Sequence, residues 1–149
     1  MKRREFILAL GGAAAAWPLA ARAQQAERMR RVVFLHALAR NDPEVRTRVA
    51  AFRQGLETLG WVENRNVQVE HRFSGGDFAQ MQAHATELVS SPPDLIVASG
   101  SPVVAALKRA SRTIPIVFSA VIDPVGQGFI ASLSRPGGNI TGSPSSTSL

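Results

Sequence analysis

The sequence predicts an α/β fold in three layers, a parallel sheet of about five strands with helices on both faces. Short apolar runs alternate with stretches of helical period in the order βαβαβαβαβ, and the connections between them are short. One run, Leu-Ile-Val-Ala at 95–98, is apolar without alternation, which is typical of a strand buried on both faces. Strands separated by helices pair in parallel through right-handed crossovers, so a doubly covered sheet follows.

The first half of the chain supplies two strands and two helices. Residues 31–36 are an apolar run of β-formers and are predicted as the first strand. Residues 44–59 are predicted as a helix that ends at Gly60, because apolar side chains recur at spacings of three and four. These side chains are Val45, Val49, Phe52, Leu56 and Leu59. Residues 66–73 alternate and predict a half-exposed strand near a sheet edge, and residues 78–90 predict the second helix.

The second half repeats the same unit. The buried strand at 94–98 is followed by a helix predicted over residues 102–111. Residues 113–119 predict the fourth strand, and residues 125–133 predict a short helix that two glycines weaken. A last short strand is expected over residues 139–142.

The N-terminal 23 residues have the three regions of an export signal. Residues 2–4 are Lys-Arg-Arg, residues 6–16 are apolar, and residues 21–23 are Ala-Arg-Ala, so we expect cleavage after Ala23 and a periplasmic location. The apolar stretch is shorter than the roughly 20 residues that span a bilayer, so the mature chain is not expected to cross the membrane. Residues 3–7, Arg-Arg-Glu-Phe-Ile, resemble a twin-arginine signal, although the general secretion route stays open.

Composition and missing motifs exclude several function classes. The chain has no cysteine, which excludes disulfides, thiolate metal sites and a cysteine nucleophile. The predicted signal inflates the net charge of +6, and the rest lacks the clustered basic face of a nucleic-acid binder. H-E-x-x-H, G-x-S-x-G and a G-x-G-x-x-G after the first strand are all absent. We therefore predict no catalytic residue, no metal and no cofactor.

Polar turns follow the predicted strands at their carboxyl ends, where open parallel sheets bind ligands. Hydroxyls, free N–H groups and one carboxylate suit noncovalent recognition of a small polar molecule. An anionic group of that molecule could bind at the N-terminus of the helix that Pro102 begins, with Ser101 as its N-cap. Asp123 could accept a hydrogen bond from an ammonium group. The candidate ligand-binding residues are His36, Ala37, Ser99, Gly100, Ser101, Ser119, Ala120 and Asp123.

A structural interpretation stays open for several of these residues. Ser101 can simply cap its helix, and Asp123 can simply cap the helix expected to start at Pro124. The three histidines lack the spacing of a zinc-binding helix and are more often structural in such positions.

Several segments taken together carry a family resemblance. After the signal come Phe-Arg-Gln-Gly-Leu-Glu-Thr-Leu-Gly-Trp at 52–61, Asn-Val-Gln-Val-Glu at 66–70, Pro-Asp-Leu-Ile-Val at 93–97, Ile-Pro-Ile-Val-Phe at 114–118, Asp-Pro-Val at 123–125 and Arg-Pro-Gly-Gly-Asn-Ile-Thr-Gly at 135–142. From Met1 to about Gly142 the chain resembles the ABC-transporter substrate-binding protein family, which has the type I periplasmic-binding fold.

The resemblance implies two α/β lobes joined by a hinge that close over a solute, and some relatives are associated with aromatic amino acids. Family members are longer, so we expect residues 24–142 to be the N-terminal lobe and residues 143–149 to be a disordered or truncated tail. The implied partners are the small solute, bound by the loops after strands one, three and four, and ABC permease subunits of the inner membrane. A lobe without its partner is expected to bind weakly. The alternative is a small flavodoxin-like or hydrolase-like exported enzyme that is complete at this length.

Overall fold

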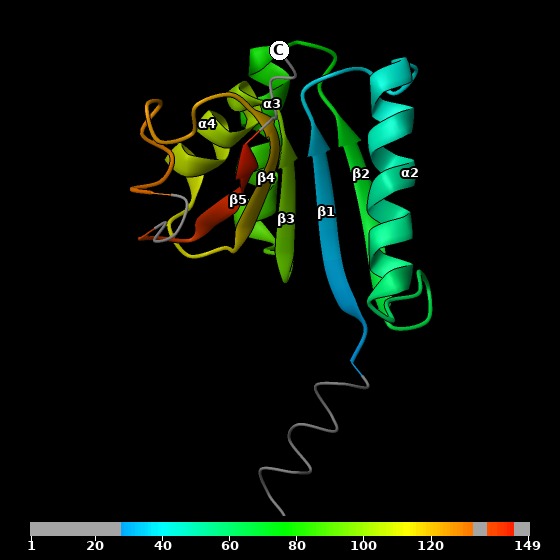
Figure 1. Cartoon of the computed structure of the whole chain (residues 1–149). Helices are drawn as coiled ribbons and strands as arrows, with labels where there is room; N and C mark the ends of the chain where they lie inside the picture. Colours follow the sequence, from blue (N-terminus) through cyan, green and yellow to red (C-terminus); the bar gives the residue numbers. More distant parts are fainter. Residues whose placement is uncertain (1–27, 133–136, 145–149) are drawn as a thin grey trace, which may run out of the picture.

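The computed structural model describes residues 28–132 and 137–144, so the predicted signal at 1–23 and residues 145–149 of the predicted tail lie outside the described residues. The described residues form a five-stranded sheet in the order β2-β1-β3-β4-β5 (Figure 1). All four neighbouring strand pairs are parallel. The predicted α/β class and parallel sheet are thereby confirmed.

The strands and the first three helices follow the predicted order. They are β1 (Arg30–His36), α2 (Pro43–Thr58), β2 (Val67–Phe73), α3 (Phe78–Ser90), β3 (Leu95–Ser99), α4 (Ser101–Ala110), β4 (Ile116–Val121) and β5 (Ile140–Pro144). Aspartates cap the first two helices, because the Asp42 carboxylate accepts from the Glu44 N–H at 2.9 Å and the Asp77 carboxylate accepts from the Ala79 N–H at 2.9 Å.

Helices cover both faces of the sheet (Figure 1). Val33 and Leu35 of β1 belong to the larger core cluster, which also contains buried residues of α3 and α4. Val32 and Phe34 alternate with them and face the other way, into a smaller cluster where Phe52 of α2 packs. Strand β2 is an edge strand, as its alternating sequence predicted, and β3 is central and almost wholly buried.

Helix α2 is less buried than its apolar stripe predicted. Val45 is the buried residue of this helix, Phe52 is half-buried, and Leu59, just after the helix, is 76% exposed. The stripe is therefore buried at Val45, half-buried at Val49, Phe52 and Leu56, and exposed only past the end of the helix.

The helix predicted over residues 125–133 is wrong for the part that the structure describes. Residues 124–128 form consecutive turns, and residues 129–132 are irregular. Asp123 and Gly128 have positive φ angles of 49° and 77°, which the repeating right-handed backbone of a helix does not contain.

The fourth strand begins later than predicted, at Ile116 instead of residue 113. The Ser111 hydroxyl accepts from the backbone N–H groups of Thr113 and Ile114 at 3.2 and 3.1 Å. This turn keeps both residues out of the sheet. Strand β5 extends two residues beyond the predicted end, to Pro144, which pairs with Val121.

Phe118 of β4 provides a test of the core. It is 1% exposed, so Phe118→Ala is expected to lower the free energy of unfolding by about 3–5 kcal/mol through lost burial and a residual cavity. Phe118→Leu keeps most of the volume and is expected to cost about 1 kcal/mol. Urea unfolding provides the measurement.

The matched control is Phe78→Ala, because Phe78 is 43% exposed at the start of α3. Its expected cost is below about 1 kcal/mol. Equal losses at Phe118 and Phe78 would contradict this assignment of the core.

Candidate functional site

Three predicted site residues lie side by side at the carboxyl edge of the sheet. His36 pairs with Ser99 in the register of β1 and β3, and Ser99 pairs with Ser119 in the register of β3 and β4. Parallel strands present their carboxyl ends at one edge, so the turns that follow these residues also gather there. The structure therefore brings these three predicted residues together at one edge of the sheet.

Backbone hydrogen bonds continue the strand pairing into these turns. The Ala37 N–H donates to the Ser99 carbonyl at 3.2 Å, and the Gly100 N–H donates to the Ser119 carbonyl at 3.1 Å. Both N–H groups are therefore satisfied by the protein. Ala37 and Gly100 define the shape of this edge but do not offer these donors to a ligand.

Helix α4 begins at this edge without a side-chain cap. Its N-cap residue is Gly100, so the prediction that Ser101 is the N-cap is wrong. Ser101 is the first residue of the helix instead, and its hydroxyl accepts from the Gln127 side chain at 3.3 Å. No acidic side chain lies in the first turn, so the helix dipole there is not compensated from within α4. This end of the helix favours an anionic group.

Position 100 requires a glycine, both because of its backbone conformation and because of a close neighbour. Its φ angle is +104°, and a Cβ atom at this position would lie 3.0 Å from the Ala37 Cβ. The turns after β1 and β3 thus approach each other so closely that only glycine fits comfortably.

Arg48 of α2 is a site residue that the sequence did not single out. Its Nη1 donates to the Ser99 hydroxyl at 2.5 Å, and its Nη2 also donates to the Glu44 carboxylate one turn earlier. The Arg48 side chain is 24% exposed, so its charge is held at the sheet edge next to the start of α4. The helical spacing could have indicated that Arg48 lies near the sheet. Arg48 is three residues after Val45 and four before Phe52, so it lies on the flank of the apolar stripe.

His36 is packed into the protein. It is 1% exposed and its ring stacks on Phe34 and Phe73 at centroid distances of 4.0 and 4.9 Å. Its Nε2 lies 3.3 Å from Nδ1 of His71. Burial, with smaller contributions from the nearby His71 and Arg48, lowers the pKa of His36 to about 4. His36 is therefore a neutral packing residue at neutral pH, and this geometry favours its structural interpretation.

Asp123 stabilises its own turn. Its carboxylate accepts from the Gly126 N–H at 2.9 Å, and its carbonyl accepts from the Gln127 N–H at 3.0 Å. A Cβ atom at Gly126 would lie 2.0 Å from the Asp123 carboxylate, so the turn depends on this glycine. Ala120, inside β4, has a positive φ of 54° and lies where the pairing of β4 with β5 is irregular, between Phe118 and Val121. Residues 124–132 contain no helix for Asp123 to cap, and the geometry supports a structural role for its carboxylate in this turn.

The arrangement suits recognition of an anionic group on a small molecule. A guanidinium, a buried hydroxyl and an uncapped helix N-terminus meet at one edge of the sheet. Within residues 28–132 and 137–144, no cluster of three or more His, Cys, Asp or Glu side chains could hold a metal ion. Over the same ranges, no helix is long and apolar enough to span a bilayer.

Comparison with known proteins places this geometry in a family context. Residues 40–148 match the family described as ABC transporter substrate binding protein. The chain is similar to a tyrosine-binding protein of Clostridioides difficile (strain R20291), with 36% identity over 91 residues. That alignment covers 61% of this chain and 26% of the relative.

Solved structures share the fold. The chain superposes with a TM-score of 0.71 on the ABC domain in complex with L-Trp from Streptococcus pneumonia, at 25% identity, covering 78% of this chain. It superposes with a TM-score of 0.71 on the ligand-free, open structure of a substrate binding protein with adhesive properties from Clostridium difficile, at 27% identity and 76% coverage of this chain. A conserved domain protein from Vibrio cholerae gives a TM-score of 0.72 at 31% identity and 77% coverage. The chain spans 38% of each of these three structures.

The depressed pKa of His36 predicts a loss of stability in acid. The pKa is about 4 in the folded state and 6.5 in the absence of the fold, so between these values the unfolded chain binds more protons. The contribution of neutral His36 to the free energy of unfolding is complete above pH 6.5 and declines as the pH falls toward 4. From this group we expect the free energy of unfolding to be about 2 kcal/mol lower at pH 5 than at pH 7.5.

Denaturant unfolding at both pH values measures this difference. His36→Phe keeps an aromatic ring between Phe34 and Phe73 but cannot titrate, so its pH difference should be smaller by about 2 kcal/mol. An unchanged pH difference in this variant would show that His36 is not the group responsible.

The close approach at Gly100 predicts a steric penalty. Gly100→Ala is expected to lose about 1 kcal/mol more than Gly60→Ala, since both have a positive φ but a Cβ at Gly60 meets open space. A double-mutant cycle with Ala37→Gly should show a favourable coupling that recovers this extra loss. Additive effects in thermal or urea unfolding would exclude the contact.

Proposed function

Because the chain belongs to the ABC transporter substrate binding protein family, we propose that it binds a small amino acid solute noncovalently at the carboxyl edge of its sheet. The observation that supports this most is the convergence of Arg48, the Ser99 hydroxyl and the uncapped start of α4. In this proposal the solute carboxylate lies between the guanidinium and the helix N-terminus, where charge and hydrogen-bond donors are complementary to it.

The relatives support an aromatic amino acid as the solute class. One relative is named as a tyrosine-binding protein, and one solved structure is in complex with L-Trp. The predicted residues at the ends of β1, β3 and β4 divide into two groups in this proposal. Ser101 contributes a hydroxyl beside the carboxylate and the buried Ser99 hydroxyl orients Arg48, whereas Ala37, Gly100, Ser119 and Ala120 shape the edge on which the solute lies.

His36 and Asp123 have indirect roles in the proposed site. His36 fixes the end of β1 through its ring stack, and Asp123 holds the turn after β4 through Gly126. Solute recognition requires no proton transfer, and the chain is proposed to bind its solute without chemical turnover.

The proposed setting is the periplasm, with export directed by the signal-like residues 1–23 and cleavage after Ala23. The twin-arginine-like segment Arg-Arg-Glu-Phe-Ile supports the corresponding route. The proposed partners are ABC permease subunits, which receive the solute. Residues 24–142 correspond to the N-terminal lobe of a two-lobed binding protein in this proposal, so full affinity requires closure against a second lobe.

Thermal unfolding with solutes tests the carboxylate assignment. L-tryptophan or L-tyrosine is expected to raise the melting temperature of the full chain, whereas tryptamine and tyramine, which lack the carboxylate, are not. Arg48→Gln should weaken amino acid binding by roughly tenfold or more, because it removes a charge-assisted hydrogen bond worth about 1.5–3 kcal/mol.

Two further variants make this result specific. Ser99→Ala should weaken binding several-fold, since it removes the hydroxyl that orients Arg48. Arg65→Gln is the matched control, because Arg65 is exposed in the turn before β2, at the other end of the sheet. Equal stabilisation by the amines, or unchanged affinity in Arg48→Gln, would refute the proposed site.

A further inference from the structure

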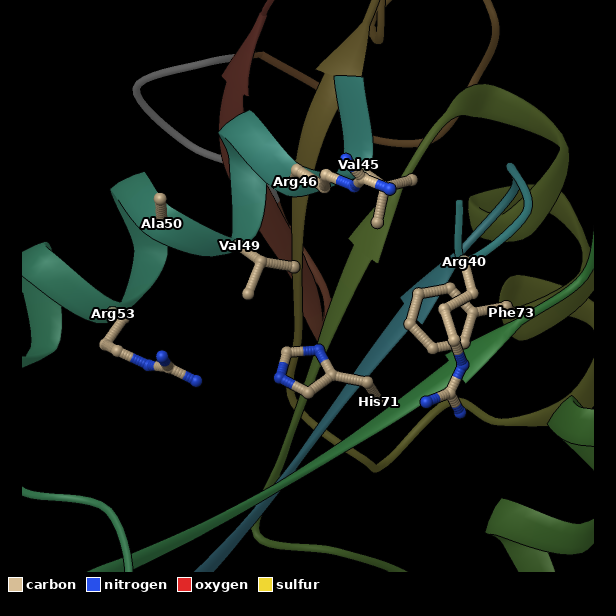
Figure 2. A pocket seen from close by; sticks show the side chains of 8 residues that line it. All are labelled: Arg40, Val45, Arg46, Val49, Ala50, Arg53, His71 and Phe73. Atoms are coloured by element: carbon tan, nitrogen blue, oxygen red, sulfur yellow. The ribbon is translucent and has the colours of Figure 1, made fainter. Parts of the chain in front are cut away.

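A hollow lies between α2 and the end of β2. It has a volume of about 360 Å³ and is open to solvent. Figure 2 shows its lining side chains, which come from the loop after β1, from α2 and from the end of β2. The residues that matter for its chemistry are Arg40, Arg46, Val49, Arg53, His71 and Phe73.

The charged groups of this pocket are all basic. Three arginines and one histidine line it, and none of the lining residues is acidic. Arg53 has a partial partner in Glu63, at 3.5 Å, but within the described residues Arg40 and Arg46 form no ion pair. The Arg40 guanidinium lies 4.8 Å from the centre of the Phe73 ring. Cations gathered in a concave site raise the local concentration of anions.

The rest of the lining is apolar. Val45, Val49 and Ala50 of α2 and the ring of Phe73 complete it (Figure 2). Figure 2 also shows the guanidinium groups of Arg40 and Arg53 on either side of the His71 ring. A ligand that fits both features has an anionic group for the arginines and an apolar body for these side chains.

This pocket is separate from the edge where Arg48 meets Ser99. Arg46 and Arg53 are seven residues apart and lie on one face of α2, whereas Arg48 is displaced around the helix and reaches β3. The pocket involves the edge strand β2, which does not contribute to the proposed amino acid site.

We propose that the pocket between α2 and β2 is a second binding site, which takes a small organic carboxylate with an apolar body. The carboxylate contacts Arg46 and Arg40, and the body packs on Val49 and Phe73. This site goes beyond the proposed amino acid site and does not depend on it.

The histidine in the pocket provides a spectroscopic reporter. Burial lowers the pKa of His71, Arg53 and Arg40 lower it further, and Glu63 opposes them. The other charged or titratable groups that face this pocket are Arg46 of α2 and His36 of β1, whose Nε2 lies 3.3 Å from Nδ1 of His71. A bound carboxylate offsets the positive charge around His71, so its pKa should rise when the site is filled.

NMR titration of the full chain tests the proposal with three probes: phenylacetate, its neutral analogue benzyl alcohol, and inorganic phosphate. Phenylacetate is expected to bind saturably, to shift the methyl resonances of Val49 and to raise the pKa of His71. Benzyl alcohol at the same concentration should cause less than about a tenth of the occupancy, since it lacks the charge. Phosphate binding as tight as phenylacetate binding would overturn the proposal, because the apolar body would then contribute nothing.

Variants locate the bound probe. Arg46→Gln should weaken phenylacetate binding about tenfold, whereas Arg65→Gln should leave it unchanged. If Arg46→Gln disturbs the fold, Val49→Asp offers an independent test, since it adds a repelling charge on the same wall. Unchanged phenylacetate affinity in both Arg46→Gln and Val49→Asp, or shifts confined to the amides of Ser99 and Gly100, would mean that the probe occupies another site and would falsify this one.

Discussion

The shared register of β1, β3 and β4 is the constraint on which the rest of the structure depends. Strand β3 lies at the centre, pairs in parallel with a strand on each side, and is buried on both faces. Residues that pair in register lie side by side, so His36, Ser99 and Ser119 lie together at one edge of the sheet. The turns beyond them are then bonded to each other through Ala37 and Gly100. The position of α4 follows, since it starts where β3 stops.

Helix α2 places positive charge beside the sheet. Its apolar stripe contacts the sheet only in part, so arginines on both flanks of the stripe remain close to the strands. Arg48 on one flank reaches Ser99, and Arg46 and Arg53 on the other flank line the pocket beside His71. Arg48 is half-buried and Arg46 and Arg53 are exposed, so all three keep their charge near solvent, which suits capture of anions. One helix thus supplies arginines to both of the proposed sites.

The aromatic and imidazole rings under α2 explain why a residue at a promising position has a packing role. His36 ends a strand at the expected edge, but its ring is stacked between Phe34 and Phe73 and shielded from water. A buried imidazole next to Arg48 is stable only in its neutral form, which fits packing better than contact with a solute carboxylate. Successive strand side chains point to opposite faces, so His36 lies on the same face as Phe34. The alternation in the sequence therefore already indicated that the two rings pack together.

Periodicity, turn residues and motif content in the sequence were sufficient to establish the α/β class, the parallel sheet, the approximate element bounds and the edge that carries the candidate site. These features depend on local patterns, and a parallel sheet follows almost necessarily from alternating strands and helices. The tertiary structure alone decided that Arg48 meets Ser99, that Gly100 rather than Ser101 caps α4, that Asp123 closes its own turn and that three arginines share a pocket. Periodicity tells which face a residue occupies, whereas its neighbour on that face comes from another part of the chain. That pairing is set by the crossovers and by the packing distance between α2 and the sheet, which no local pattern contains.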